Sequence, residues 1–339
     1  MGEENHRLEA KLGLWDATAV SVGAIIGAGI FVVTGIASGL AGSALPVSMA
    51  IAAVIALLTA LSFAELSSWQ PREGSVYEYA YQLISPFYGF LTGWMWIVSN
   101  IFTGAAVAMG LAGYLHAVFP ALPSKAVAAV VCVVFSIFNF LGAKQSSFLN
   151  NVLVAAKLLI LGFFALYGFF HLDEANFADF NPVQPGVIYG AFIIFFAYGG
   201  FARVAVIAEE VKDARRNVPR AVLLSLMIST VFYILVGVVA VGLVGAQRLA
   251  DSGSPLADAI KVAGNPYAVY VVSSGGLIAT ASVLLTSILG VSRMAYSMAR
   301  RGDLPGWFMK LHGKYRTPYY AIWIVCAIMV FLVVFVDLS

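Results

Sequence analysis

Two glycine-rich stretches decide the fold of this chain: Gly23-Ala-Ile-Ile-Gly27-Ala-Gly29-Ile-Phe31 and Phe195-Phe196-Ala-Tyr198-Gly199-Gly200-Phe201. Both lie inside long apolar segments. In a bilayer, backbone N–H and C=O groups must be satisfied within the protein, so residues that weaken a helix at membrane depth need a reason. One reason is that the unwound backbone binds a polar solute. We therefore expect two membrane-spanning helices to be broken at these stretches.

The composition is that of a polytopic membrane protein. Hydrophobic residues make up 61% of the chain and charged residues 11%, and the mean hydropathy is +0.92, whereas a soluble domain averages about 25% charged residues. Cys132 and Cys326 lie in apolar segments without a C-x-x-C spacing, so neither a disulfide nor a metal site is expected. We expect no cofactor, no nucleic-acid partner and no cleaved signal peptide.

Nine apolar segments are candidates for membrane spans. An α-helix needs about 20 residues to cross the hydrocarbon core. The expected spans cover residues 14–40, 45–67, 86–115, 126–142, 148–170, 186–208, 221–244, 268–299 and 319–336.

Lys and Arg residues collect on one side of these spans. If the N-terminus is cytoplasmic, fourteen of the nineteen basic residues fall on the inner side and three on the outer side, while Lys157 and Arg203 fall within spans. Because cytoplasmic loops carry the excess of Lys and Arg, we expect a multi-pass protein of the cytoplasmic membrane with its N-terminus inside.

The two expected breaks fall in the first and sixth spans. Because these spans lie five apart, the two helices run in opposite directions across the bilayer. Two halves of opposite topology, each beginning with a broken helix, form an inverted repeat. We expect one all-α transmembrane domain over residues 1–339, with half-repeats at about 12–170 and about 186–336.

Five motifs, in order along the chain, resemble the amino acid–polyamine–organocation (APC) superfamily. They are Gly27-Ala-Gly29; Pro71-Arg-Glu-Gly74-Ser-Val-Tyr77-Glu-Tyr79; Asn139-Phe-Leu-Gly142-Ala-Lys144; Tyr198-Gly-Gly-Phe201 followed by Glu209-Glu210-Val-Lys212-Asp-Ala-Arg-Arg-Asn217-Val-Pro219-Arg220; and Gly290-Val-Ser-Arg293 through Gly302-Asp-Leu-Pro305. The resemblance covers nearly the whole chain. It implies the five-plus-five inverted repeat of the leucine-transporter type and the function of an amino-acid transporter.

The chain departs from the resembled pattern in three respects. Ser75 stands where a second glycine is usual, and Ala214 stands where proline is usual. The resembled fold also needs ten core helices, and only about nine spans precede Ser339. The second half-repeat is therefore expected to be incomplete.

The first break offers a cradle for an anion. If the helix unwinds at residues 27–29, a half-helix begins near Ile30, and its free N–H groups and positive dipole end favour a carboxylate. The alternative is that Gly23 and Gly27 form a small-xxx-small packing face. The predicted substrate-binding residues here are Ile26, Gly27, Ala28 and Gly29.

The second break offers acceptors for an ammonium group. Unwinding at residues 199–200 would expose carbonyls at the end of a half-helix, and such carbonyls suit a cation. An α-amino acid carries both groups and is the expected substrate. By the resemblance, Phe196 aligns with an aromatic lid over the substrate, and Tyr198 is a second gate candidate; ordinary aromatic packing is the alternative. The predicted substrate-binding residues here are Phe196, Ala197, Gly199 and Gly200.

Lys157 lies deep within the fifth span. It follows Phe148, where that span begins, by nine residues, or about 13–14 Å at about 1.5 Å per residue. Intramembrane ionisable residues are functional candidates by default. By the resemblance, proton-coupled members carry a lysine in a similar run, where related transporters bind sodium. Its partner in the eighth helix would be Ser282, or else Thr280. We predict Lys157 and Ser282 as the proton-coupling pair; a fixed structural cation is the alternative.

Other charged residues lie towards the inner face. Arg203 follows the second break and is either a pocket residue or a helix-end arginine that reaches the interface. Four further residues are expected to form a network that stabilises the closed state: Glu209, Glu210, Lys212 and Arg293. The alternative is that they are solvated charges on loops.

These features favour a secondary transporter of amino acids that works by alternating access, with helices one, two, six and seven rocking against the remainder. Proton symport is preferred to sodium symport, and the apolar lining favours neutral substrates. The expected partners are an amino acid, protons and the lipid bilayer. An exchanger and a non-transporting amino-acid sensor remain alternatives. An enzyme is not expected, because the chain contains no H-E-x-x-H motif, no paired mid-membrane carboxylates and no Ser/His/Asp set.

Overall fold

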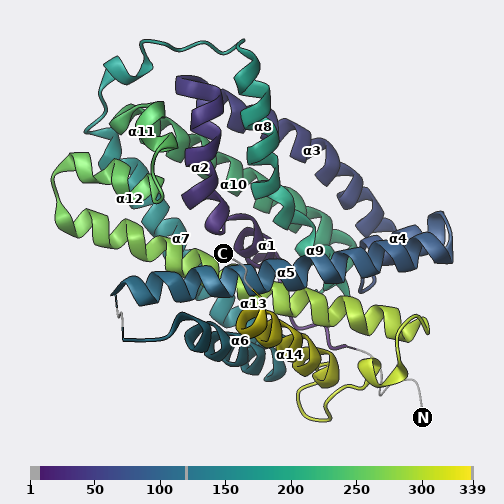
Figure 1. The fold of residues 1–339 in the computed structure, drawn as a ribbon. Helices are drawn as coiled ribbons and strands as arrows, with labels where there is room; N and C mark the ends of the chain where they lie inside the picture. Colours follow the sequence, from purple (N-terminus) through teal and green to yellow (C-terminus); the bar gives the residue numbers. More distant parts are fainter. Residues whose placement is uncertain (1–7, 119–120, 337–339) are drawn as a thin grey trace.

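The computed structural model describes residues 8–118 and 121–336, and α-helices dominate both ranges (Figure 1). Two isolated β-bridges, Leu12 with Val211 and Leu311 with Pro318, occur among the described residues. The longer helices are α1 (Leu14–Ile25), α2 (Ala28–Ala41), α3 (Leu45–Trp69), α4 (Val76–Leu83), α5 (Pro86–Val118), α6 (Ser124–Phe140), α7 (Ala143–Phe169), α8 (Pro185–Tyr198), α10 (Ala214–Val244), α13 (Pro266–Arg300) and α14 (Tyr319–Phe335).

Short helices connect these elements. Three lie between α8 and α10, and the rest join neighbouring long helices. They are η2 (Gly42–Ala44), η3 (Glu174–Phe177), η4 (Gly199–Ala202), α9 (Arg203–Val206), η5 (Ala208–Glu210), α11 (Ala246–Ala250), α12 (Pro255–Ile260), η6 (Lys261–Ala263) and η7 (Gly306–Met309).

Each of the nine expected spans has a helical counterpart in the described part of the chain. Six apolar stretches there are long enough to cross a bilayer, and α1, α6 and α14 are shorter apolar helices. The largest difference is at α10, which begins at Ala214 rather than at residue 221. Its first turns carry Arg215, Arg216 and Arg220, so a search for apolar residues misses them although the backbone is already helical.

Two departures from the resembled motif pattern have a local explanation. Ser75 has φ 42°, in the left-handed region that costs residues with a Cβ about 1–2 kcal/mol, so glycine suits this position better. Ala214 is the first residue of α10, the position where proline is tolerated because its missing N–H is not needed.

The ends of several helices meet at a surface that we call the basic end, formed by residues 70–76, 206–214 and 300–318. Backbone N–H of Gly74 donates to Val206 O at 3.2 Å, and Lys212 N–H donates to Leu12 O at 2.8 Å. The Thr317 hydroxyl donates to Phe140 O at 2.9 Å. These bonds join loops that lie far apart in the sequence.

The opposite end is held together in the same manner. Backbone N–H of Asp173 donates to Gly242 O at 2.9 Å, and the Ser38 hydroxyl donates to Ala246 O at 3.1 Å. Figure 1 shows α11 and α12 at this end, away from α4. Helices therefore run between the two ends in alternating directions.

The buried side chains form two apolar cores. One core is shared by the broken-helix pairs α1–α2 and α8–α9 with α3, α7 and α10. The other is shared by α5, α6 and α14, which Figure 1 shows on the near side of the molecule. Helix α13 contributes to both, through Val272 and Ala279 in the first and Leu284 and Met294 in the second. It thus ties the two cores together, as does α9 through Ala205 in the first core and Val206 in the second.

Candidate functional site

The first expected break is a true interruption of the helix. Helix α1 ends at Ile25, and α2 begins at Ala28, two residues before the predicted Ile30. Between them Ile26 has φ −77° and ψ 82°, and Gly27 is extended, with φ −118° and ψ −154°. Gly27 provides no side-chain cap for α2. Because the first N–H groups of a helix lack intrahelical acceptors, the start of α2 has N–H donors that no side chain of Gly27 caps. The Ala28 side chain lies outside what the structure describes.

The second expected break is tighter than predicted. After Tyr198 the backbone passes through the 3₁₀ segment η4 and then into α9, and the residues that cap these segments, from Tyr198 to Arg203, keep right-handed helical dihedrals. The helix changes here from α to the tighter 3₁₀ geometry and does not unwind into an extended segment. A 3₁₀ stretch inside a long helix often marks a hinge.

Close packing of the two breaks explains one glycine. A Cβ placed on Gly200 would lie 2.3 Å from the Ala24 carbonyl carbon and 2.4 Å from the Ile25 nitrogen. Only a residue without a side chain lets η4 approach the backbone of α1 this closely. The predicted pair of breaks is therefore brought together in space. A Cβ on Gly29 would likewise lie 3.1 Å from the Ala197 Cβ.

Tyr233 of α10 joins the two breaks, and the sequence reasoning missed it. Its buried hydroxyl lies 2.8 Å from Ile25 O and 3.1 Å from Ala197 O. The first carbonyl closes α1, and the second belongs to a residue predicted to bind the substrate ammonium. A polar tip in an otherwise apolar stretch of α10 is the signal that could have identified it.

Lys157 lies against the first break, fully buried. Its Nζ donates to Gly23 O at 3.0 Å, to Ile26 O at 2.5 Å and to Ser282 Oγ at 3.1 Å. An ammonium group has three N–H donors, so all three are used. The structure therefore brings Lys157, Ser282 and the broken helix together. Thr280, the other candidate, instead bonds to the carbonyls of its own helix at Gly276 and Leu277.

Asn150 completes this cluster. Its Oδ1 accepts from the Ser282 hydroxyl at 3.2 Å, and its Nδ2 donates to Ala19 O at 2.9 Å. Asn150 precedes Lys157 by seven residues, so the two lie on one face of α7. This spacing is the signal that sequence reasoning did not use.

Gly23 and Gly27 also face α13. A Cβ on Gly23 would lie 2.9 Å from Ser282 Oγ, and one on Gly27 would lie 2.4 Å from Val283 Cγ2. The packing alternative for these glycines therefore holds at the same time as the helix break, because both require a missing side chain.

The two gate candidates are placed differently. Phe196 is 81% exposed, whereas Tyr198 is buried with its ring centroid 4.9 Å from that of Tyr233. A Cβ placed on Gly199 would meet open space within 4 Å in the described part of the chain. In this conformation Tyr198 packs against Tyr233 in the protein interior, whereas the Phe196 side chain is exposed. Their gating roles stay predictions.

Arg203 is buried inside the protein. Its Nη2 donates to Asn100 Oδ1 at 2.7 Å, and its guanidinium carbon lies 5.0 Å from the Trp96 ring centroid. Its Nη1 is buried without a hydrogen-bond partner among the described residues. The arginine thus links the end of the sixth helix to α5.

The expected network at the basic end divides into separate ion pairs. Arg293 and Glu210 form a buried pair, with Nε and Nη2 each 2.8 Å from Oε1. Arg300 pairs with Glu209 at 2.7 Å, and Arg301 pairs with Glu78 at 2.6 Å. Lys212 contributes its backbone N–H. Glu78 and Arg301 were not predicted.

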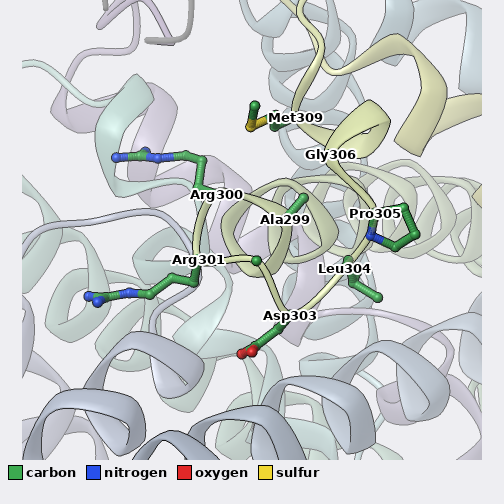
Figure 2. A pocket seen from close by; sticks show the side chains of 9 residues that line it. Ala299, Arg300, Arg301, Asp303, Leu304, Pro305, Gly306 and Met309 are labelled. Carbon is green, nitrogen blue, oxygen red and sulfur yellow. The ribbon is translucent and has the colours of Figure 1, made fainter.

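An open hollow of about 700 Å³ lies at the basic end and not at the helix breaks. Figure 2 shows that the side chains of Arg300 and Arg301 extend to the same side of it, away from Pro305. Within residues 8–118 and 121–336, no group of three His, Cys, Asp or Glu side chains is placed to hold a metal ion.

Comparison with known proteins gives consistent matches. The sequence profile of the family described as amino acid permease matches residues 12–338. An uncharacterized transporter of Mycobacterium tuberculosis is 36% identical over 98% of this chain and 75% of its own length. The branched-chain amino acid permease of Bacillus subtilis is 32% identical over 93% of this chain and 72% of its own length.

A solved structure shows the fold. A Na⁺-coupled sialic acid symporter in a substrate-bound outward-open state superposes with a TM-score of 0.71 over 99% of this chain and 77% of its own, at 11% identity. The likeness at this identity concerns architecture alone. It establishes the all-α inverted-repeat fold of the leucine-transporter type, with interruptions in the first and sixth helices.

Proposed function

The chain belongs to the amino acid permease family, and from that premise we propose that it is a proton-coupled transporter of neutral amino acids that works by alternating access. Membership supports a multi-pass membrane transporter of amino acids, and the relatives are named as transporters and permeases and not as enzymes. The proton coupling, the substrate's side chain, the orientation and the single domain of two half-repeats, about 12–170 and about 186–336, are our proposal.

The helix breaks supply groups of the right kind for a zwitterion. The uncapped start of α2 favours the substrate carboxylate through its N–H groups and its positive dipole end. The carbonyl of Ala197 is proposed to accept from the substrate ammonium. It already accepts from Tyr233, but a carbonyl oxygen has two lone pairs and can accept twice. The proposed site residues remain Ile26, Gly27, Ala28, Gly29, Phe196, Ala197, Gly199 and Gly200.

A neutral substrate is favoured by the charges near the breaks. Arg203 directly follows η4, and it is buried without an acidic partner in the described part of the chain. A buried cation this close disfavours a second positive charge through Coulomb repulsion, which is strong where water is excluded. We therefore expect cationic amino acids to bind less well than neutral ones.

One observation carries the proton-coupling proposal: the buried ammonium of Lys157 is held by two carbonyls of the broken helix and by Ser282. Two of these acceptors belong to α1 and its break. Loss of the proton removes one N–H donor and the positive charge, so the hydrogen bonds that hold the carbonyls at the break are weakened. The protonation state of Lys157 is thereby linked to the shape of the substrate cradle.

The same contact explains how coupling reaches the whole molecule. Lys157 lies on α7 and Ser282 on α13, and both helices are outside the proposed moving bundle of helices one, two, six and seven. Lys157 donates a hydrogen bond to Gly23 O of α1, which belongs to that bundle, and another to Ser282. A proton at this joint therefore biases how the bundle sits on the remainder. The Lys and Arg distribution supports a cytoplasmic basic end and a cytoplasmic N-terminus.

The test is uptake into proteoliposomes under an imposed pH gradient. The substrate is first chosen from the twenty amino acids by thermal shift, because a ligand of the folded state raises apparent stability. Lys157→Gln is expected to lower gradient-driven uptake by about tenfold or more, since a hydrogen bond to a charged group is worth about 1.5–3 kcal/mol.

The control is counterflow exchange without a gradient, which K157Q should largely retain if the variant is folded. Undiminished gradient-driven uptake in K157Q would refute coupling through this residue. Exchange without any response to the gradient in the wild type would identify an exchanger, and binding without flux would identify a sensor.

A further inference from the structure

Glu73 is a buried carboxyl group at the basic end to which no role has been assigned. Its side chain is 1% exposed, and both carboxyl oxygens are buried without a hydrogen-bond partner among the described residues. A carboxylate removed from water in this way is costly unless it is paired. Such a group either finds a cation or holds a proton.

The backbone around Glu73 is pinned from two sides. The Ser297 hydroxyl of α13 donates to Glu73 O at 2.7 Å, and the next residue, Gly74, donates to Val206 O at 3.2 Å. A Cβ on Gly74 would lie 2.4 Å from Ser297 Oγ. The carboxyl is therefore held between the loop after the second span, the end of the sixth helix and α13.

Titratable groups on η5 and α13 interact with Glu73. Glu209 and Glu210 face it from η5, and Arg293, Tyr296 and Arg300 face it from α13. Glu78 of α4 lies across Ser297, whose hydroxyl is 3.5 Å from Glu78 Oε1.

The nearby cations are already committed. Arg293 pairs with Glu210, Arg300 pairs with Glu209, and Arg301 pairs with Glu78. Glu73 is then a surplus acid beside matched pairs. Burial first, and then the negative charges of Glu210 and Glu209, raise the pKa of Glu73 well above its ordinary value, against the smaller opposite effect of Arg293 and Arg300.

We propose that Glu73 is a second proton-binding site, distinct from Lys157, which takes up a proton when the basic end closes and releases it when that end opens to water. The step is a simple protonation of a carboxylate to a carboxylic acid. Closure removes the carboxyl from water and places it beside Glu210, and opening restores its hydration. The link to transport rests on the alternating-access mechanism proposed above, whereas the site itself does not.

The sign of the pH effect follows from this geometry. The closed conformation binds the proton more tightly than the open one. Below the ordinary carboxyl pKa, Glu73 is protonated in both conformations and exerts no bias. As the pH rises above that value, the open form loses its proton first, so the closed form is progressively disfavoured. Acidification of the basic end therefore favours closure.

Infrared spectroscopy of the purified protein tests the site directly. In an ester-free detergent near neutral pH, the wild type should show the C=O stretching band of a protonated carboxyl group, and the band should disappear as the pH is raised. Glu73→Gln should abolish it. Glu65→Gln, which changes an exposed acid at the end of α3, should leave it unchanged. A wild-type spectrum indistinguishable from that of E73Q between pH 5.5 and 8.5 would overturn the proposal.

A labelling experiment tests the link to closure. In a C132S/C326S background, V206C places a reporter thiol at a fully buried position beside Glu73. Maleimide labelling should rise with pH more steeply when Glu73 is present than in E73Q, whose neutral amide mimics the protonated acid. Identical pH profiles in both would refute the proton-linked closure. Neither readout depends on Lys157 or on uptake, so a failure here is distinct from a failure of the proposed function.

Discussion

At the residue scale, single polar groups hold the backbone where the helices are interrupted. Tyr233 places its single O–H donor within hydrogen-bond distance of two carbonyls, the last one of α1 and that of Ala197. Lys157 holds the other side of the same break through Gly23 O and Ile26 O. A buried carbonyl without a donor costs free energy, so these two side chains stabilise a backbone shape that an unbroken helix would not need.

Tyr233→Phe tests this role. The variant keeps the ring against Tyr198 but removes the O–H, and it should lower the free energy of unfolding by about 1–3 kcal/mol, the cost of an unsatisfied buried polar group. Thermal unfolding in detergent measures the change. Tyr270→Phe, on the exposed surface of α13, is the matched control and should be neutral. Equal melting temperatures for Y233F and wild type would contradict the bridge.

At the element scale, the two interrupted helices are built by different means. In the first, the extended residue Gly27 separates α1 from α2. In the second, the backbone only tightens into the 3₁₀ segment η4. The difference follows from their neighbours, because Lys157 occupies carbonyls at the first break, while η4 is packed against α1 through Gly200.

A pair of adjacent glycines provides a matched comparison. Gly200→Ala would drive a methyl group into the backbone of Ala24 and Ile25, whereas a Cβ at Gly199 has open space around it within 4 Å across the described chain. We expect G200A to lose about 1–3 kcal/mol of stability, as overpacking does, and to lose the substrate-dependent thermal shift. G199A should retain its stability, because its added methyl group meets no neighbouring atom within 4 Å in the described chain. If the two variants behave alike, close packing of the breaks is not what this glycine provides.

At the scale of the whole molecule, a buried ion pair fastens the end of the sixth helix to α13. Glu210 and Arg293 are 2% and 0% exposed at their side chains, whereas Glu209 and Arg300 are 18% and 33% exposed. Removing one partner of a buried pair leaves an uncompensated charge, which costs about 3–5 kcal/mol. Exposed pairs contribute about 0–1 kcal/mol.

Glu210→Gln should therefore lower stability strongly, and Glu209→Gln should not, although the two changes are chemically the same. Thermal unfolding of the two variants side by side makes the measurement. Comparable losses would show that burial does not set the strength of these pairs.

The fold could be predicted largely from the sequence. Hydropathy predicted helices at nine places because a membrane span needs a long apolar run, and glycines marked both interruptions because no other residue lets the backbone approach so closely. The position of Lys157 within its apolar run also made it a candidate before any contact was known. These are local properties, which depend on the residues of one segment.

Only the tertiary structure decided which groups meet. Nothing in the sequence around Tyr233, Asn150 or Glu73 says that the first would reach two carbonyls, the second would hold Ser282, and the third would be buried beside matched ion pairs. The polar partners of these groups lie between 36 and 208 positions away along the chain where they are hydrogen-bonded. A side chain's partner is set by the packing of whole helices, and that packing minimises the free energy of all contacts together, so no local pattern encodes it.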